Sequence, residues 1–368
     1  MAGAALLLAA SRPVRADWPT FRGDNARSGH ASAGISDQPS VVWKAELGGS
    51  VDGPPVVAGG KVFVGTSSGV FAAVAADTGE VLWRTRLDGA ICSAAAVAGE
   101  RLVVGTSRRR VYCLSTQGKE LWRVTAGDAV VASPLIVGER CVWGSMDGVL
   151  HAVNLSDGHL VWERKLSGGV SSAAAEAGGV VYVADEGGVV WAIRATDGEV
   201  LWKRETGCLG MAAPVVAGDL LLVPLVSPTR LAPPKVPYLM ALARATGEVR
   251  WQVVQARSVF SSPLWTERGV VYVSVEGYLS ETMLRCQSSD GGREVWKRRV
   301  GGVVDSSPAL AGDRLYFGAH DGCLYVVEVK RGIPLSRVPL ATKIFSSPAL
   351  DNGRLYIGAN DGCLYCLQ

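Results

Sequence analysis

Tryptophan recurs along this chain at a nearly constant interval. Successive members of the series are separated by 40, 39, 40, 40, 49 and 45 residues. The series consists of Trp43, Trp83, Trp122, Trp162, Trp202, Trp251 and Trp296. An eighth position, within residues 331–337, lacks the indole. Self-similarity at a fixed period of about 40 residues indicates a repeat architecture.

A second marker, rich in Ser, Ala and Pro, falls between the tryptophans and occurs eight times. Its copies lie at residues 53–55, 93–95, 133–135, 171–173, 212–214, 261–263, 306–310 and 346–350. Each unit continues with alternating apolar runs separated by turns such as Asp361-Gly362. Such turns favour hairpins, because their central residues need positive φ. We therefore expect four strands per unit and an all-β chain.

Four strands repeated eight times predict a single eight-bladed β-propeller with four-stranded antiparallel blades. The last unit supplies only three strands, whereas residues 41–47 read as an unpaired fourth strand. Pairing these two segments would close the ring and remove exposed sheet edges. The alternative, an open solenoid, leaves both edges exposed. Insertions lengthen the fifth unit at residues 225–237 and distort the sixth at residues 276–281.

The first 40 residues precede the repeats and divide into two parts. Residues 1–16 combine an apolar run with Val14 and Ala16 at the −3 and −1 positions of a cleavage site. This pattern is typical of a secretory signal peptide with cleavage before Asp17. Residues 17–40 would form an N-terminal arm, and residues 41–368 the propeller. We expect an exported protein, periplasmic or extracellular, without a transmembrane segment.

The net charge of +3 argues against nucleic-acid binding. Loss of residues 1–16 removes two arginines and no acid, so 35 basic and 34 acidic residues would leave +1.

The segment from Ala73 to Trp83 reads Ala-x-Ala-x-x-Thr-Gly-x-x-x-Trp. It resembles the tryptophan-docking motif of pyrroloquinoline-quinone (PQQ)-like repeats, and looser copies occupy residues 152–162, 192–202 and 241–251. The Asp that this family carries at the third position is absent from all four copies. The resemblance implies that the spaced tryptophans form a structural girdle between blades. Burial of an indole whose N–H finds a backbone acceptor agrees with that role.

Two classes of protein share this family, and fold alone does not choose between them. Quinoprotein dehydrogenases hold PQQ and Ca²⁺ over the axis, with acidic and amide ligands and a disulfide between adjacent cysteines. This chain has no adjacent Cys pair and no C-x-x-C-H haem motif. The second class resembles BamB and binds protein partners without a cofactor. We expect a BamB-like, non-catalytic scaffold with no cofactor and no metal, and keep a PQQ- and Ca²⁺-dependent dehydrogenase as the alternative.

A third reading is a carbohydrate- or polymer-binding propeller. It would use the tryptophans outside the series, Trp143, Trp191 and Trp265, although core packing explains these residues better.

Strand order predicts where a binding face would lie. Loops from each fourth strand to the next blade should emerge on the same face as the hairpins between second and third strands. The candidate ligand- or partner-binding residues there are Arg108, Arg109, Arg110, Asp147, Asp185, Glu186, Glu276, His320, Asp321, Asn360 and Asp361. The arginine triplet stands where other units have Asp-Gly or Ser-Gly. For each residue the alternative is a solvated hairpin tip. We expect a monomer that binds a protein of the cell envelope.

Overall fold

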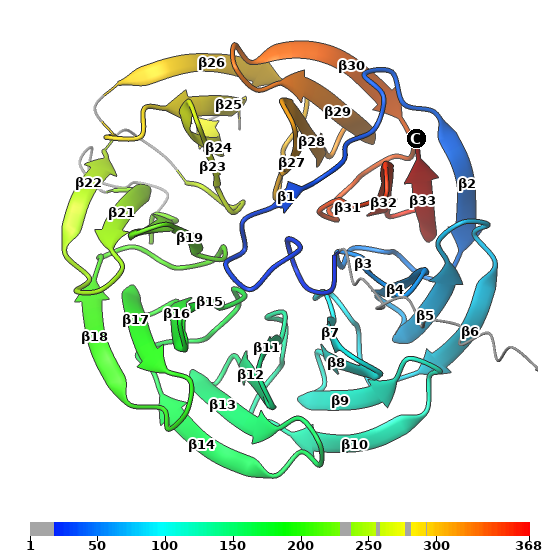
Figure 1. Ribbon diagram of the computed structural model, residues 1–368, viewed down its shortest axis with the longest axis vertical. Coiled ribbons are helices and arrows are strands. Elements are labelled where there is room, and N and C mark those ends of the chain that lie inside the picture. The colour runs from blue at the N-terminus through cyan, green and yellow to red at the C-terminus, as the bar shows by residue number, and fades with distance from the viewer. Residues whose placement is uncertain (1–17, 229–236, 255–257, 277–280, 292) are drawn as a thin grey trace, which may run out of the picture.

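The computed structural model describes residues 18–228, 237–254, 258–276, 281–291 and 293–368. Eight antiparallel sheets stand around one axis as the blades of a closed ring (Figure 1). This confirms the predicted eight-bladed propeller. The predicted signal peptide and most of the two predicted insertions lie outside the described residues. Within those residues, the structure contains no helix that is long and apolar enough to cross a membrane.

Each blade runs from an inner strand at the axis to an outer strand at the rim. Blades 1 to 4 consist of β3 (Val56–Ala58), β4 (Lys61–Gly65), β5 (Val70–Ala75) and β6 (Val81–Arg86); β7 (Ala96–Ala98), β8 (Arg101–Gly105), β9 (Arg110–Ser115) and β10 (Glu120–Thr125); β11 (Leu135–Val137), β12 (Arg140–Gly144), β13 (Val149–Asn154) and β14 (Leu160–Lys165); and β15 (Ala175–Ala177), β16 (Val180–Ala184), β17 (Val189–Arg194) and β18 (Val200–Glu205). Blades 5 to 8 consist of β19 (Val215–Ala217), β20 (Leu220–Pro224), β21 (Leu239–Ala243) and β22 (Val249–Val253); β23 (Leu264–Thr266), β24 (Gly269–Glu276), β25 (Glu281–Gln287) and β26 (Glu294–Val300); β27 (Ala309–Ala311), β28 (Arg314–Gly318), β29 (Cys323–Glu328) and β30 (Ile333–Pro339); and β31 (Ala349–Asp351), β32 (Arg354–Gly358), β33 (Cys363–Leu367) and β2 (Val41–Glu46).

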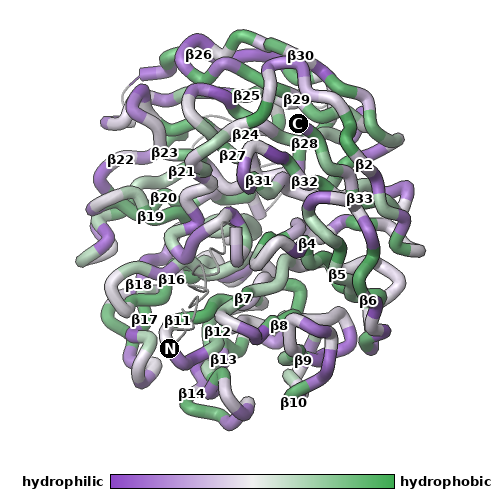
Figure 2. The backbone as a smooth tube through the Cα atoms, turned by 45° about the vertical axis from the view of Figure 1, so that its right-hand side comes forward, coloured by the Kyte–Doolittle hydropathy of each residue, from purple (hydrophilic) through white to green (hydrophobic). Residues whose placement is uncertain are grey.

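The strand order gives the ring two different faces. We call the face that carries the outer-to-inner loops and the second-to-third hairpins the upper face. The inner strands run from it toward the lower face, which carries the remaining turns. The middle strands are buried on both sides, and hydrophobic residues follow the strands around the ring, whereas many turns are hydrophilic (Figure 2). Blade-to-blade packing of these strands forms the core.

The ring closes by pairing two segments that are distant in sequence. Strand β2 is antiparallel to β33, with Lys44 opposite Tyr365. Ser40 and Gln368 add two backbone hydrogen bonds, of 3.0 and 3.1 Å, beyond the end of this pair. The closure predicted for residues 41–47 is therefore confirmed, with the strand ending at Glu46.

Each of the seven spaced tryptophans lies between its own blade and the next. Every indole N–H donates to a backbone carbonyl of the following blade at 3.0 or 3.1 Å. A glycine from the third-to-fourth turn of that blade lies against each ring. Gly79, with φ of 77°, is the example at Trp43, where an added Cβ would come within 2.7 Å of the indole. The glycine turn between the third and fourth strands of each of these blades is thus the surface on which the tryptophan of the preceding blade packs.

The one junction without tryptophan joins blades 7 and 8. Its outer strand β30 carries Leu335 in the corresponding region, packed against the core. The receiving blade has no continuous third-to-fourth turn, because Ser40 and Gln368 meet there instead. The missing tryptophan therefore coincides with the missing glycine turn on which an indole would lie.

The N-terminal arm lies across the lower part of the central channel, against the inner strands (Figure 1). Its backbone bonds to inner-strand residues of five blades, starting with Trp18 on Val57 in blade 1. It continues to β1 (His30–Ala31), which pairs in parallel with β27 of blade 7. Side chains extend the contacts: Asn25 donates to Ile136 of blade 3, and His30 donates to the Trp265 carbonyl of blade 6. The arm therefore links seven blades directly before Ser40 reaches the eighth.

Two arginines in the arm are buried without a carboxylate hydrogen-bond partner. Arg22 donates five hydrogen bonds, including those to the Ser262, Pro263 and Pro308 carbonyls of blades 6 and 7. Arg27 donates to the Ala174 and Pro134 carbonyls and to two acceptors within the arm. Burial lowers the pKa of Arg22 to about 9 and that of Arg27 to about 10, so both stay charged at neutral pH. Arg22 and Arg27 are therefore part of the packing inside the channel.

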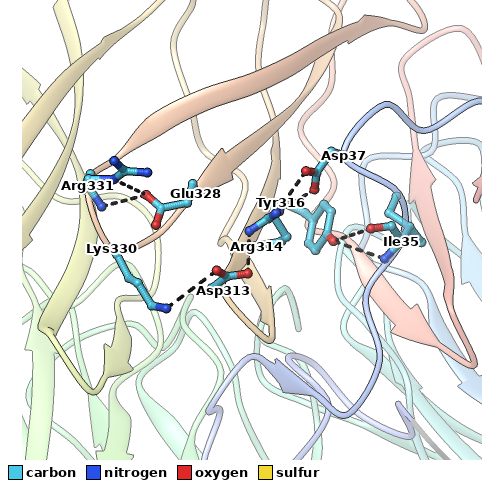
Figure 3. A network of polar contacts seen from close by, with 8 residues as sticks. All are labelled: Ile35, Asp37, Asp313, Arg314, Tyr316, Glu328, Lys330 and Arg331. Carbon is cyan, nitrogen blue, oxygen red and sulfur yellow. Dashed lines mark hydrogen bonds and ion pairs between the residues drawn. The ribbon is translucent and has the colours of Figure 1, made fainter.

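The end of the arm is held on blade 7 by a polar network (Figure 3). The Tyr316 hydroxyl accepts from the Ile35 amide at 3.1 Å and donates to the Ile35 carbonyl at 3.0 Å. Arg314 forms ion pairs with Asp37 of the arm and with the adjacent Asp313. This pairing holds the pKa of Asp37 below its ordinary value.

Candidate functional site: the upper mouth of the central channel

The channel opens on the upper face into a cavity of about 180 Å³. Eight lining residues each stand four positions before an inner strand, one from every blade. We call them the mouth ring: Asp52, Cys92, Val131, Ser171, Met211, Phe260, Asp305 and Phe345. Phe21 of the arm also lines the cavity. The cavity therefore opens upward and is closed below by this chain itself.

The residue before each mouth position anchors the ring. In seven blades it is a buried Val or Ile. In six of these blades its amide donates to the carbonyl at the start of a neighbouring second-to-third hairpin, as Ile91 does to Thr66. In five of them the side chain packs on a glycine that ends a neighbouring second strand, and a Cβ on Gly65 would lie 2.1 Å from the Ile91 side chain. These contacts hold the mouth residues of those blades in place, which preorganises that part of the ring.

One side of the mouth ring alternates aromatic rings and carboxylates. From blade 6 through blade 8 to blade 1 the order is Phe260, Asp305, Phe345, Asp52. His320 approaches Asp305, with Nε2 3.0 Å from the carboxylate, and its ring meets Phe345 edge-on at 4.4 Å between centroids.

The adjoining part of the ring, at blades 5 and 6, is apolar. Met211 and Phe260 are 40% and 37% exposed, in a protein whose other aromatic side chains are mostly buried. They form a ledge with Val275 and Val303 that borders a further hollow of about 460 Å³ beside Asp305.

Serines form a belt just below the mouth. Ser133, Ser307 and Ser347 accept hydrogen bonds from amides of neighbouring blades. By contrast, the hydroxyls of Ser93 and Ser262, two residues that line the cavity, are buried and make no hydrogen bond within the described residues. A buried hydroxyl without a partner costs free energy, so a donor or acceptor that reached either group would be favoured.

The structure distributes the predicted site residues over different roles. Asp185 is fully buried, and its carboxylate accepts from Ser167, Val189 and the Trp191 indole. Asp321 and Asp361 each accept from a tyrosine hydroxyl four residues on. These three carboxylates have internal partners and stabilise hairpins.

The remaining predicted acids and amides also lie in or beside hairpins. Asp147 accepts from the Val149 amide, and Asn360 accepts from the Lys343 amide. Glu186 bonds through its backbone to Gly169. The side chain of Glu276 lies outside the described residues. Among the predicted residues whose side chains the structure describes, His320 contacts the mouth ring through its side chain, at Asp305 and Phe345.

The arginine triplet lies on the hairpin between β8 and β9, away from the cavity. Arg108 is exposed and 3.7 Å from Asp88. Arg110 donates to Thr125. Arg109 has φ of 62°, at the position where five sister hairpins have glycine with φ of 78° to 84°. A non-glycine residue held in the left-handed region is strained, and such strain is often found at functional positions.

Sequence reasoning missed the mouth ring. Its members differ in chemistry from blade to blade, so composition gives no signal. Position does give one, because six of the eight members stand directly before the small-residue marker of their repeat, and the other two lie within two residues of its start. Among the tryptophans outside the series, Trp143 and Trp191 are buried in the core.

The mouth residues do not fit PQQ with Ca²⁺. This cofactor is a planar tricarboxylate, and such anions are held by cationic or N–H donors. The described lining offers two carboxylates and contains no Lys, Arg or Trp. The described part of the chain also contains no group of three or more His, Cys, Asp or Glu residues placed to hold a metal ion.

Comparison with models of known protein families shows which family this chain belongs to. The family model for outer membrane protein assembly factor BamB matches residues 33–115, 107–227 and 230–368. The chain belongs to this family. No curated protein matches the sequence of this BamB-family propeller.

Solved structures share the fold at low sequence identity. BamB from Moraxella catarrhalis is 18% identical, with a TM-score of 0.76 over 90% of this chain and 97% of that one. The quinohemoprotein alcohol dehydrogenase from Comamonas testosteroni is 13% identical, with a TM-score of 0.79 over 96% and 80%. The computationally designed Ika8 protein is 16% identical, with a TM-score of 0.73 over 88% and 98%. Assembly factors, oxidoreductases and designed rings therefore share this architecture, and the site must distinguish among them.

Proposed function

We propose that this protein is a non-catalytic binding propeller that recognises a protein partner through the mouth ring and the apolar ledge of its upper face. The observation that carries this proposal is the exposure of Met211 and Phe260 on adjacent loops. Exposed aromatic and Met side chains are enriched at protein interfaces. Family membership supports the same reading, because the matching family is named for an assembly factor.

We further propose that the protein is exported and acts as a monomer. Cleavage before Asp17 would leave Trp18 as the second residue, and Trp18 is only 1% exposed against blade 1. The arm would then begin to dock almost at the mature N-terminus. Mass spectrometry of protein recovered outside the cytoplasm tests this, with Asp17 expected as the first residue. Recovery of residues 1–16 on that material would contradict it.

Photocrosslinking tests the binding face. A benzoylphenylalanine replaces Phe260 at the ledge or, as a control, Leu160 on the outer rim, which is 57% exposed. In envelope extract of the native source, we expect a discrete adduct from position 260 and none from position 160. Met211→Asp in the crosslinking protein should abolish that adduct. Equal adducts from both positions, or none from position 260, would contradict a partner site on the upper face.

A further inference from the structure

We infer that the mouth cavity receives the cationic side chain of an Arg or Lys from an extended segment of the partner, next to an apolar residue of that segment. This inference rests on the proposed function and specifies its ligand. It concerns the cavity itself, the ledge beside it and the unpaired groups on its wall.

Charge selects the sign of the ligand. The described lining residues include Asp52 and Asp305 and no Lys, Arg or His; His320, just outside the lining, lies 3.0 Å from the Asp305 carboxylate. Coulomb attraction in a partly enclosed cavity is stronger than in bulk water, so these two carboxylates favour a cation. The Asp52 carboxylate accepts only a local hydrogen bond from Ser50 among the contacts of the described residues, which leaves acceptor capacity.

Hydrogen bonding selects a cation with N–H groups. Ser93 and Ser262 line the cavity, are at least nine-tenths buried, and carry hydroxyls with no protein partner in the described structure. Each hydroxyl oxygen can accept from a guanidinium or ammonium N–H. These serines belong to the belt below the two carboxylates, so acceptors are available at two levels of the cavity.

The aromatic rings favour an organic cation over a hydrated metal ion. Phe260 and Phe345 flank Asp305 in the ring order. A guanidinium or alkylammonium gains cation–π attraction when it lies over an aromatic face. Metal ions would need a larger set of oxygen ligands than these two carboxylates supply.

The ledge indicates that the cation belongs to a peptide segment. Met211, Phe260 and Asp305 line both the mouth cavity and the wider hollow of about 460 Å³ that also includes Val275 and Val303. A free amine would leave this apolar surface exposed. An extended segment covers it with a neighbouring apolar side chain while its basic side chain enters the mouth.

The lower half of the channel already uses the same chemistry within the chain. There Arg22 enters the axis and donates to carbonyls of Ser262, Pro263 and Pro308. Ser262 thus gives its carbonyl to the arm's guanidinium, and the same residue lines the mouth cavity.

Methyl NMR of the full-length protein tests the inference. Five methionines are present, and Met211 is the one at the mouth ring, so its ¹³C-labelled ε-methyl reports on the site while Met146 and Met240 serve as internal controls. The probe is N-acetyl-Leu-Arg-Leu-amide at low ionic strength. The matched probe replaces Arg by citrulline, which is nearly isosteric but neutral. Argininamide tests whether the cation alone is sufficient.

We expect the Arg peptide to shift the Met211 signal and to bind ~10-fold more tightly than the citrulline peptide, because charge-assisted hydrogen bonds are lost with the charge. It should also bind more tightly than argininamide. Asp305→Asn and Asp52→Asn should each weaken binding several-fold. Asp128→Asn, which removes an exposed carboxylate on the same face outside the cavity, should not.

Equal affinity for the Arg and citrulline peptides would overturn the inference, as would argininamide binding as tightly as the Arg peptide, or an unchanged Met211 signal. These outcomes are distinguishable from failure of the proposed function. If position 260 still crosslinks a partner, the binding role stands and only the ligand chemistry is wrong. If that crosslink is also absent, the partner site itself is wrong.

Discussion

The polar groups that converge on the axis are treated differently at the two ends of the central channel. At the lower end, backbone carbonyls converge on the axis, and the arm supplies the donors through two buried arginines. At the upper end, the mouth ring presents carboxylates and apolar side chains to the cavity. The polar groups at the lower end therefore have partners within the chain, whereas the proposed function assigns the upper end to a partner protein.

Removal of an arm arginine should have the largest effect. Arg22→Ala leaves several buried carbonyls without donors, and each such acceptor costs about 1–3 kcal/mol. We expect the free energy of unfolding to fall by about 3–5 kcal/mol, in the range for breaking a buried charged network. Chemical denaturation measures it. Arg22→Lys keeps the charge but not the planar guanidinium, so it should recover only part of the lost stability. A decrease below about 1 kcal/mol for Arg22→Ala would contradict a stabilising role of the arm.

Substitutions at the upper end of the channel should weaken partner binding and leave the stability of the protein unchanged. Met211→Asp combined with Phe260→Asp replaces two exposed apolar residues by acids, so the melting temperature should hardly change. Partner affinity should fall by at least ~10-fold, because apolar anchors dominate interface energetics. Binding of the crosslinked partner, once identified, is measured by titration. Leu160→Asp is the control on the rim, and an equal loss there would remove the distinction between face and rim.

Replacement of Arg109 should change the free energy of unfolding by a smaller amount, and should increase it. Arg109→Gly relieves a left-handed conformation that its sister hairpins assign to glycine, and should raise the free energy of unfolding by about 1 kcal/mol. Thermal melts detect this gain. If the triplet also contacts the partner, Arg108→Glu with Arg110→Glu should weaken capture. Unchanged capture would remove the triplet from the binding face.

The smallest effect should come from the exposed end of the arm. The Arg314 guanidinium lowers the pKa of Asp37 below 3.8, so the unfolded chain binds the extra proton first as the pH falls. The stabilisation is complete above that value and is lost as the pH falls through the lower pKa of the folded state. Asp37→Asn should therefore lower stability slightly at pH 7 and make no difference in strong acid. Melting curves at pH 7 and pH 2.5 compare the two proteins, and an equal deficit at both pH values would contradict this pairing.

The repeat made the fold predictable from sequence. Tryptophan spacing, glycine turns and small-residue markers repeat together, and the resulting blade count and closure agree with the observed sheets. The residues of the candidate site could not be predicted from the sequence in the same way. Hairpin carboxylates such as Asp185 look like surface ligands in the sequence, yet Asp185 is buried beneath the Trp191 indole. A polar residue at a turn has the same local pattern whether its side chain faces water or the turn.

The sequence by itself determined the number of blades, their strand order and the pairing of β2 with β33, because these depend on patterns repeated every 40 residues. Only the tertiary structure decided that the arm enters the channel and that eight dissimilar residues meet at its upper mouth. The physical reason is convergence on an axis. Residues 39 or more positions apart become neighbours there, and their combined charge and shape are properties of the ring that no single repeat contains.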